Sequence, residues 1–367
     1  MDGRHLVVRW PGRMTDLWQR LKVRFPIIQA PMAGGPSTPQ LAAAVGQAGG
    51  LGFLGAAYLT GEQITRQVEQ ARALHGGPVG LNLFIESNAI PPDSGQVERA
   101  AAALWPFHAE LGLPPATLPI RVSVPFEEQW EAVLNARPEV FSFTFGQLSA
   151  ERVRRLQAQG TVVMGTATTV AEARALETTG VDAVIAQGSE AGGHRGTFLH
   201  PAEEALVGTL ALVAQLVDAV RIPVIASGGI MDGRGIRAVL TLGAHGVQLG
   251  TAFLLTPEAG TSAPYRAALG RAQDHVTTLT RAFSGRLARG LSNRVTREFP
   301  QEALLPYPYQ NALTRSMRSE ASLQGRAEFL SLWAGQGAHL ARDLPAGALV
   351  STLAQEAGLS PVPGELR

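Results

Sequence analysis

The sequence predicts an α/β fold: a (β/α)8 or TIM barrel with an additional, mostly helical C-terminal lid segment. First, eight short apolar segments alternate with helical patterns between residues 27 and 251, which is typical of parallel βαβ units. Second, these segments are continuously apolar, as expected of strands that are covered on both faces. Third, the 367 residues, of which 45% are hydrophobic, suffice for one barrel with extensions.

Each predicted strand is a short apolar run, and each predicted helix is a segment whose apolar residues recur at helical spacing. The predicted strands are Ile27–Met32, Leu51–Ala56, Val79–Phe84, Val140–Phe145, Val162–Thr166, Ala183–Gln187, Pro223–Ser227 and Gly246–Thr251. The predicted helices between them are Pro39–Ala48, Gly61–Leu74, Glu127–Ala136, Glu151–Gln159, Val170–Thr179, Glu203–Ala219 and Gly233–Leu242. An open doubly wound sheet is the alternative, but its glycine fingerprint follows the first strand. Here that strand runs into QAPMAGG, residues 29–35, without GxGxxG.

Two segments fall outside the alternation. Residues 86–125 form a long proline-bearing stretch with a helical pattern at Val97–Leu111, and residues 256–367 carry several further helical patterns. We therefore expect residues 1–255 to form the barrel and its cofactor site. Residues 256–325 are expected to form a helical lid on the substrate side, and residues 326–367 to form C-terminal helices that pack on the barrel.

Composition excludes several classes of function. A net charge of +1, without basic clusters that interleave with aromatic residues, argues against nucleic-acid binding. There is no signal-like segment and no apolar run that could span a bilayer, so we expect a cytoplasmic protein without membrane contact. The absence of cysteine excludes thiolate nucleophiles and Cys-ligated metals. The single lysine, Lys22, precedes the first strand, which argues against Schiff-base chemistry.

The loop QGSEAGGHRG, residues 187–196, is the strongest functional signal. Its glycines allow the backbone to approach a ligand closely, and its histidine can exchange a proton near neutral pH. The loop has no apolar periodicity, so we favour a proton-transfer role for His194 over a structural one. The spacing of the other histidines does not indicate a metal site.

Two later glycine loops predict a phosphate site. They are ASGGI, residues 226–230, and QLGT, residues 248–251, which follow the last two strands, where barrels often bind phosphate. Backbone N–H groups of Gly228, Gly229, Gly250 and Thr251 are expected to face the phosphate. The N-terminus of the helix at Gly233 is expected to add its dipole. Tight turns without a ligand are the alternative. Arg195 and Arg234, beside these loops, are interpreted as solvated charges.

Other polar residues at strand ends suit a planar ligand. Asn82 and Gln187 can both donate and accept hydrogen bonds, which suits the edge of a heterocycle, with strand-end capping as the alternative. Pro31 and Met32 are expected to supply apolar contact to its ring. Tyr307 and Tyr309 belong either to a lid that places a phenol near the substrate or to a packed segment. Because no side chain here can shuttle electrons, a redox reaction would need a cofactor.

Taken together, these motifs resemble one family along nearly the whole chain. The segments QAPMAGG (29–35), GLGFLGAAY (50–58), FTFG (143–146) and YPYQNALT (307–314), with the three glycine loops, are similar to those of class I nitronate monooxygenases. The piece EAGGHRG is less specific, because FMN-dependent enoyl-carrier-protein reductases have a similar loop. The segments GAAY, FTFG and YQNALT favour the monooxygenase.

The resemblance implies an FMN-bound barrel that oxidises alkyl nitronates, such as propionate 3-nitronate, with O2 to a carbonyl compound and nitrite. It implies that His194 is the catalytic base. The family carries a lysine after the tyrosine segment, where this chain has Arg315, and an arginine can also hold an anion. Tyr307, Tyr309 and Arg315 are the expected substrate residues. The expected FMN residues are Pro31, Met32, Asn82, Gln187, Gly192, Gly193, Ser227, Gly228, Gly229, Gln248, Leu249, Gly250 and Thr251.

Two other functions stay open at this point. An NAD(P)H-dependent FMN reductase of enoyl thioesters or quinones would need a nicotinamide site, and the sequence has no separate dinucleotide signature. A phosphometabolite-binding barrel without catalytic activity would be colourless when purified. The sequence does not indicate the oligomeric state.

Overall fold

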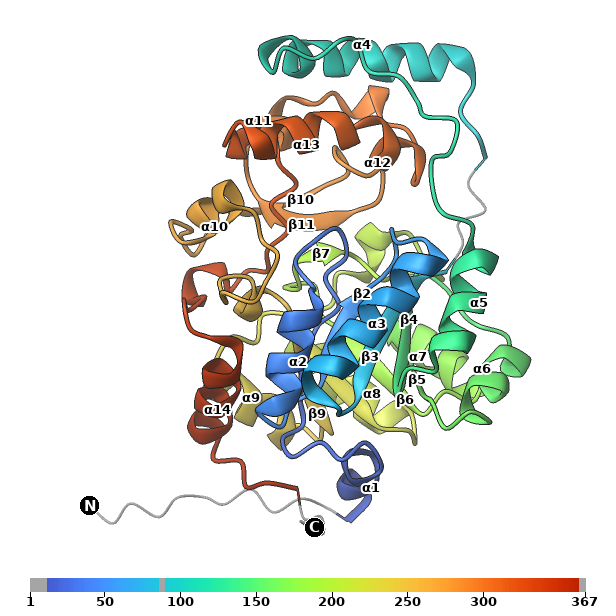
Figure 1. The fold of residues 1–367 in the computed structure, drawn as a ribbon, viewed down its shortest axis with the longest axis vertical. Helices are drawn as coiled ribbons and strands as arrows, with labels where there is room; N and C mark the ends of the chain where they lie inside the picture. Colours follow the sequence, from blue (N-terminus) through green and yellow to red (C-terminus); the bar gives the residue numbers. More distant parts are fainter. Residues whose placement is uncertain (1–11, 86–89, 363–367) are drawn as a thin grey trace.

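The computed structural model describes residues 12–85 and 90–362, and it shows a closed parallel barrel beneath a second layer (Figure 1). All eight predicted strands are present in one sheet of order β1-β9-β8-β6-β5-β4-β3-β2. The barrel closes between its two edges, where the Gln29 N–H donates to the Leu51 carbonyl over 2.9 Å. The predicted (β/α)8 barrel is therefore confirmed. Its strands are β1 (Ile27–Gln29), β2 (Gly52–Gly55), β3 (Val79–Phe84), β4 (Val140–Thr144), β5 (Val162–Ala167), β6 (Ala183–Gln187), β8 (Val224–Ser227) and β9 (Gly246–Leu249).

Among the described residues, seven helices follow barrel strands in the predicted order, and all but α8 lie close to their predicted bounds. Most begin at a Thr, Ser or Asp whose side chain accepts a hydrogen bond from the first turn, as Thr60 and Ser149 do. At the other end of the barrel from the cavity described below, α1 (Gly12–Arg20) packs through Trp18, whose Nε1 donates to the His245 carbonyl over 2.7 Å. The surrounding helices are α2 (Pro39–Gln47), α3 (Gly61–His75), α5 (Phe126–Ala136), α6 (Ala150–Gln157), α7 (Val170–Thr178), α8 (Thr209–Ala219) and α9 (Gly233–Thr241).

The prediction of one continuous helix over residues 203–219 was wrong. The structure has a short 3-10 turn, η1 (Ala202–Ala205), and α8 begins only at Thr209. Gly208 between them is extended, and the Glu190 carboxylate accepts hydrogen bonds from the Thr209 N–H and hydroxyl. Glu190 lies in the glycine loop 187–196, so the first turn of α8 is tied to that loop.

The second layer lies above the carboxyl ends of the strands, at the top of Figure 1. Residues 256–362 were expected to be mostly helical, but they also contain β10 (Thr277–Thr280) and β11 (Ala288–Leu291). These two strands form an antiparallel sheet with β7 (Gly193–His194), which belongs to the glycine loop. The helices of the layer are α10 (Ala263–Leu269), α11 (Arg294–Glu298), α12 (Tyr309–Leu313) and α13 (Arg315–Leu323).

A second hydrophobic core holds this upper layer together. Helix α4 (Ser94–Glu110) comes from the proline-bearing segment, of which residues 86–89 lie outside the described residues. It crosses the top of the molecule (Figure 1), and its Leu104 and Phe107 share this core with Phe329. The chain therefore leaves the barrel after β3, contributes a helix to the upper layer and returns to α5.

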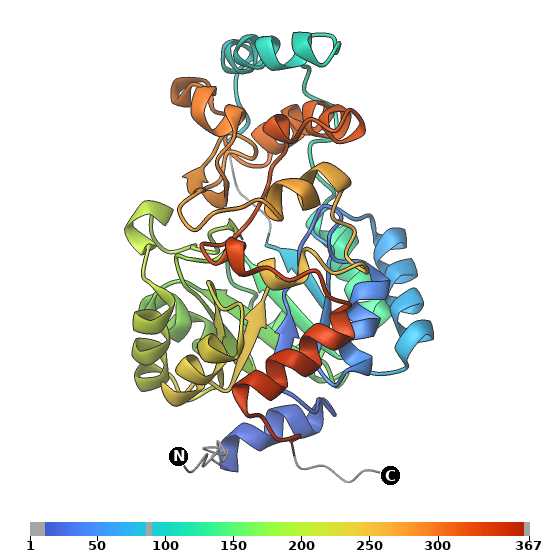
Figure 2. The ribbon, with the colours of Figure 1, turned by 90° about the vertical axis from the view of Figure 1, so that its left-hand side faces the viewer.

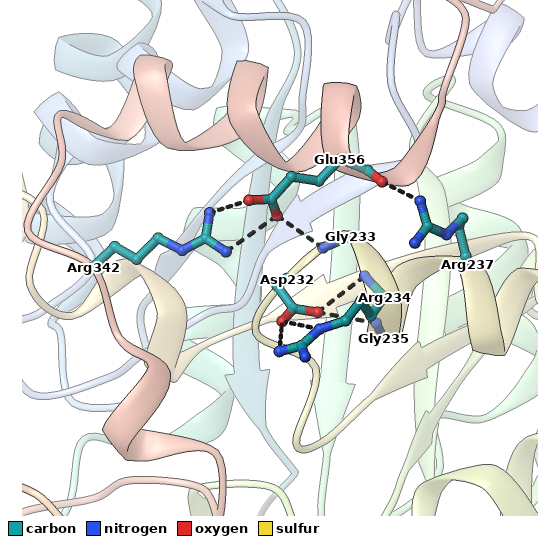
Figure 3. Close-up of polar contacts among 7 residues, drawn as sticks. All are labelled: Asp232, Gly233, Arg234, Gly235, Arg237, Arg342 and Glu356. Atoms are coloured by element: carbon teal, nitrogen blue, oxygen red, sulfur yellow. Dashed lines mark hydrogen bonds and ion pairs between the residues drawn. The ribbon is translucent and has the colours of Figure 1, made fainter. Parts of the chain in front are cut away.

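The last helix, α14 (Ala346–Ala357), lies across the outside of the barrel against α2 and α9 (Figure 2). Figure 3 shows the polar contacts at this junction. The Glu356 carboxylate accepts a hydrogen bond from the Gly233 N–H over 3.0 Å and forms a bidentate pair with Arg342. Among residues 12–85 and 90–362, no helix combines the length and the apolar character that a membrane crossing requires.

Candidate active site

A cavity of about 840 Å³ lies between the carboxyl ends of the strands and the upper layer. Its volume falls within the range of small-molecule and cofactor sites. All of the expected FMN residues lie on its wall, together with His194 and Arg315. The upper layer contributes Arg318 and Trp333. Loops that are far apart in the sequence thus meet at one site, as expected because barrel active sites lie at the carboxyl ends of the strands.

The glycine loops after β8 and β9 form a cradle of backbone donors in this wall. Gly228 and Gly229 have φ angles of 121° and 68°, which favour glycine. Within the described part of the chain, the N–H groups of Gly228, Gly229, Gly250 and Thr251 donate no hydrogen bond. All four residues line the cavity, and free backbone N–H groups that converge on one place suit an anionic group such as a phosphate.

The expected contribution of the helix at Gly233 was wrong. The Gly233 N–H donates to Glu356, and the N–H groups of Arg234 and Gly235 donate to Asp232, over 2.9–3.2 Å (Figure 3). Two carboxylates therefore already occupy the N-terminus of α9. Gly233 is also absent from the cavity wall. The sequence pattern could not show this, because Glu356 lies more than a hundred residues downstream.

The polar side chains at the strand ends use part of their hydrogen-bonding capacity on other groups of the protein. Asn82 donates to Ser142 over 2.8 Å. Gln187 donates to the His194 carbonyl over 3.0 Å and accepts from the Gly196 N–H over 2.8 Å, which leaves one N–H and one lone pair. The Gln248 Oε1 is buried without a partner in the described residues. It is an acceptor that a ligand N–H group would satisfy.

His194 is held in an aromatic surround at the cavity wall. Its ring lies 5.4–6.2 Å, between centroids, from the rings of Phe84, Phe145, Tyr307 and Trp333. Its Nε2 lies 2.8 Å from the Ser284 hydroxyl. Burial, together with the charges of Arg286 and Arg318, lowers the pKa of His194 to about 3. The imidazole is therefore neutral at neutral pH.

The expected substrate residues lie in different places. The Tyr307 ring is 6.2 Å from the His194 ring, and its hydroxyl is hydrogen-bonded to Tyr58. Burial raises the pKa of both phenols, so both keep their protons at neutral pH. Arg315 lies on the cavity wall, whereas neither Tyr307 nor Tyr309 is part of that wall, and Tyr309 packs against the second core.

Sequence reasoning missed Arg318 and Ser284. Arg318 lies three residues after Arg315 on α13, so helical spacing places it on the same face. That spacing was a usable signal. The Arg318 guanidinium donates to the carbonyl and side chain of Asn311 over 2.8 and 2.9 Å, and its Nε has no partner in the described residues. Burial lowers its pKa to about 10. Ser284 had no usable signal, because its contact with His194 spans 90 residues.

The interpretation of Arg195 as a solvated charge was also wrong. Its side chain is fully buried and donates to the carbonyls of Gly188, Gln187 and Ala205 over 2.6–3.3 Å. These hydrogen bonds therefore help to fix the conformation of the glycine loop. Arg234 is exposed, as expected, and pairs with Asp232.

Comparison with known proteins shows which family the chain belongs to. The family model described as nitronate monooxygenase matches residues 14–356. The chain belongs to the nitronate monooxygenase family. It is 43% identical over 340 residues to a probable nitronate monooxygenase of Staphylococcus aureus strain Newman, an alignment that covers 92% of this chain and 95% of the relative. The resemblance seen in the motifs is thereby confirmed.

Solved structures show the same architecture. A nitroalkane oxidase from Streptomyces ansochromogenes is 46% identical with a TM-score of 0.85, over 91% of this chain and 95% of that chain. FabK from Thermotoga maritima is 28% identical with a TM-score of 0.73, over 95% and 96% of the two chains. As a member of the nitronate monooxygenase family, the protein is an oxidoreductase that acts on small-molecule nitronates, and the family is flavin-dependent.

Proposed function

We propose that the protein uses FMN to oxidise alkyl nitronates with O2, yielding a carbonyl compound and nitrite. One observation carries this proposal: a single cavity brings together the backbone cradle, the neutral His194 and the half-buried Arg318. Propionate 3-nitronate exemplifies the substrate class. The cytoplasmic location and the division at residues 255 and 325 stay predictions.

The cavity wall suits FMN. Gly228, Gly229, Gly250 and Thr251 would hold the one phosphate of a mononucleotide, and the unpartnered Gln248 Oε1 would accept a hydrogen bond from the ring system. FAD would need a second phosphate cradle. When bound, the flavin supplies the redox chemistry, taking electrons from the nitronate and passing them to O2.

Arg318 would hold the anionic substrate. Its guanidinium is buried, it lines the cavity, and no ion pair joins it to a carboxylate among the described residues. A buried cation is stable only with a compensating partner. A planar nitronate matches the guanidinium, which can donate to two oxygens at once. Arg315, which is more exposed and lies on the same face of α13, would add charge.

His194 would act when the substrate arrives as a neutral nitroalkane. Its neutral imidazole takes the α-proton, and an imidazolium beside a nitronate anion results. That anion raises the pKa of His194, because an opposite charge stabilises the protonated form. The low pKa thus keeps the base unprotonated at neutral pH, ready to take the substrate proton. A preformed nitronate has already lost this proton and needs no base.

The cofactor can be identified directly. Heat denaturation should release a flavin that co-elutes with FMN in chromatography, in about a one-to-one ratio to protein, because the cavity has one phosphate cradle. Release of FAD, or failure to take up any flavin on reconstitution, would contradict the proposal. A colourless protein that instead binds a sugar phosphate would support the binding-barrel alternative.

The electron donor separates the proposal from the reductase alternative. Mixed anaerobically with a nitronate, the holoenzyme should lose its flavin absorbance, whereas NADH should bleach it slowly or not at all. Fast bleaching by NADH and none by a nitronate would favour a reductase of enoyl thioesters or quinones.

The role of His194 is tested with one variant and two substrates. His194→Asn should retain FMN but oxidise a neutral nitroalkane about 10²–10⁴-fold more slowly, which is the usual contribution of a positioned base. Oxidation of the preformed nitronate should suffer less. If the variant oxidises the nitroalkane at the parental rate, His194 is not the base. If it loses FMN, the histidine belongs to the cofactor site instead.

A further inference from the structure

Ser284 lies behind His194, on the side away from the cavity. It belongs to the turn between β10 and β11 and is 1% exposed. Strand β11 pairs with β7, with Ala288 opposite His194. This pairing brings the turn beneath the histidine ring and sets the Ser284 Oγ 2.8 Å from the His194 Nε2.

The other contacts of Ser284 determine which atom gives the proton in this hydrogen bond. Its Oγ accepts from the Arg286 N–H over 3.3 Å and donates to the Arg286 carbonyl over 3.1 Å. A serine hydroxyl has one proton and two lone pairs. When the proton goes to the Arg286 carbonyl, the second lone pair is left for His194. The Nε2 must then be an N–H donor.

The opposite arrangement leaves a group unsatisfied. If Ser284 donated to the His194 Nε2, the Arg286 carbonyl would lose its donor, and no other donor reaches it within the described residues. Carbonyls in a folded interior are rarely left without a partner. Only the arrangement with an Nε2–H group satisfies the Ser284 hydroxyl, both backbone groups of Arg286 and the imidazole together.

The second ring nitrogen of His194 faces the cavity. No hydrogen bond involves Nδ1 among the described residues, yet Nδ1 is not one of their fully buried unpartnered atoms. Because His194 lines the cavity, this nitrogen opens onto it. With Nε2 protonated, Nδ1 carries the free lone pair.

We propose that Ser284 is a positioning residue that holds His194 as the Nε2–H tautomer, so that Nδ1 takes the substrate proton. This inference rests on the proposed role of His194 as the base. After proton transfer the Nε2–H to Ser284 bond is unchanged and Nδ1–H faces the new nitronate anion. No second proton has to move.

The tautomer can be read directly by NMR on the flavin-loaded protein labelled with ¹⁵N-histidine. The signals that disappear in His194→Asn identify this residue among the eight histidines. We expect Nε2 to show the chemical shift of a protonated imidazole nitrogen and Nδ1 that of an unprotonated one. The reverse assignment overturns the inference, whatever the Ser284 variants do.

Variants at Ser284 test the cause of this tautomer. Ser284→Ala should yield a mixture of tautomers and lower kcat on a neutral nitroalkane about five- to tenfold, which corresponds to one lost hydrogen bond. KM and the rate on a preformed nitronate should change little. Ser284→Thr, which retains a hydroxyl, should restore the tautomer and the rate. Unchanged NMR signals and an unchanged kcat in Ser284→Ala would overturn the inference.

A matched control comes from the end of β10, next to this turn. Thr280 is buried, and its hydroxyl accepts from the Ala282 N–H over 3.1 Å. Thr280→Val also removes a hydroxyl but should leave the His194 signals and both rates at parental values. If His194→Asn retains full activity on nitroalkanes, the proposed base is wrong. The NMR result would then still stand as a finding about the tautomer.

Discussion

At the scale of single residues, the site depends on buried and half-buried arginines. Arg195, Arg286, Arg289 and Arg318 surround the glycine loop and the cavity, and burial lowers the pKa of each. They donate mainly to backbone carbonyls, as Arg286 does to Thr197 and Arg289 does to Ser189. Lysine would suit this role less well, because the guanidinium offers several donors and stays charged when buried. Burial, with the charges of Arg286 and Arg318, keeps His194 neutral, and these charges favour an anion beside it.

Removing Arg318 should weaken binding of the anionic substrate. We expect Arg318→Met to raise KM for a preformed nitronate about 10–100-fold, the usual value of a hydrogen bond to a charged group. KM for a neutral nitroalkane should rise less. Steady-state kinetics on both substrates, compared with Arg315→Met, will show which arginine anchors the anion. An equal effect of Arg318→Met on both substrates would argue against this role.

The low pKa of His194 should appear in the pH dependence of stability. The folded pKa of about 3 lies below the ordinary value of 6.5. Between these values the unfolded chain binds the extra proton, so stability falls as pH decreases, by about 1.4 kcal/mol per pH unit at most. His194→Asn should lack this contribution. Urea unfolding of both proteins at pH 7 and pH 5 will test it, and parallel losses would contradict the shift.

At the scale of secondary-structure elements, local patterns predicted the barrel well and the upper layer poorly. Each barrel strand is a run that is buried on both faces, so its own residues carry the signal. By contrast, β7 has two residues, and it exists because Arg289 pairs with Gly193 almost a hundred positions away. The break before α8 was missed for a similar reason, since Glu190 caps that helix from a distant loop. His194 stood out because its loop is unusual, whereas Ser284 and Arg318 acquire roles only through tertiary contacts.

The junction between α14 and α9 makes a prediction about stability. Glu356 satisfies the first N–H of α9 and pairs with Arg342 (Figure 3). Glu356→Ala should lower the free energy of unfolding by about 1 kcal/mol, typical of a lost helix cap, with FMN content unchanged. Glu69→Ala, at an exposed position of α3, is the control for removing a surface carboxylate. Equal unfolding curves for the two variants would show that the junction contributes little.

At the scale of the whole molecule, the cavity lies between two hydrophobic cores. Ala226 and Leu249, beside the phosphate cradle, belong to the barrel core, whereas Phe329 and Ala334 belong to the upper core. The wall is complete only when both layers are in place, since the barrel supplies the glycine loops and the upper layer supplies Arg318 and Trp333. The sequence predicted the barrel half of the wall. The other half depends on how the layers pack, which no local pattern records.

A ligand that contacts both layers should stabilise them together. We expect FMN at 100 times its Kd to raise the free energy of unfolding by about 2.7 kcal/mol, because it binds the folded state alone. Thermal unfolding of flavin-free and reconstituted protein will measure this stabilisation as a shift in Tm. Hydrogen exchange should show added protection both in the loops at Gly228 and Gly250 and in α13 of the upper layer, since all three contribute to the cavity wall. Protection confined to the barrel loops would mean that FMN leaves the upper layer free to move. An unchanged Tm would contradict binding at this site.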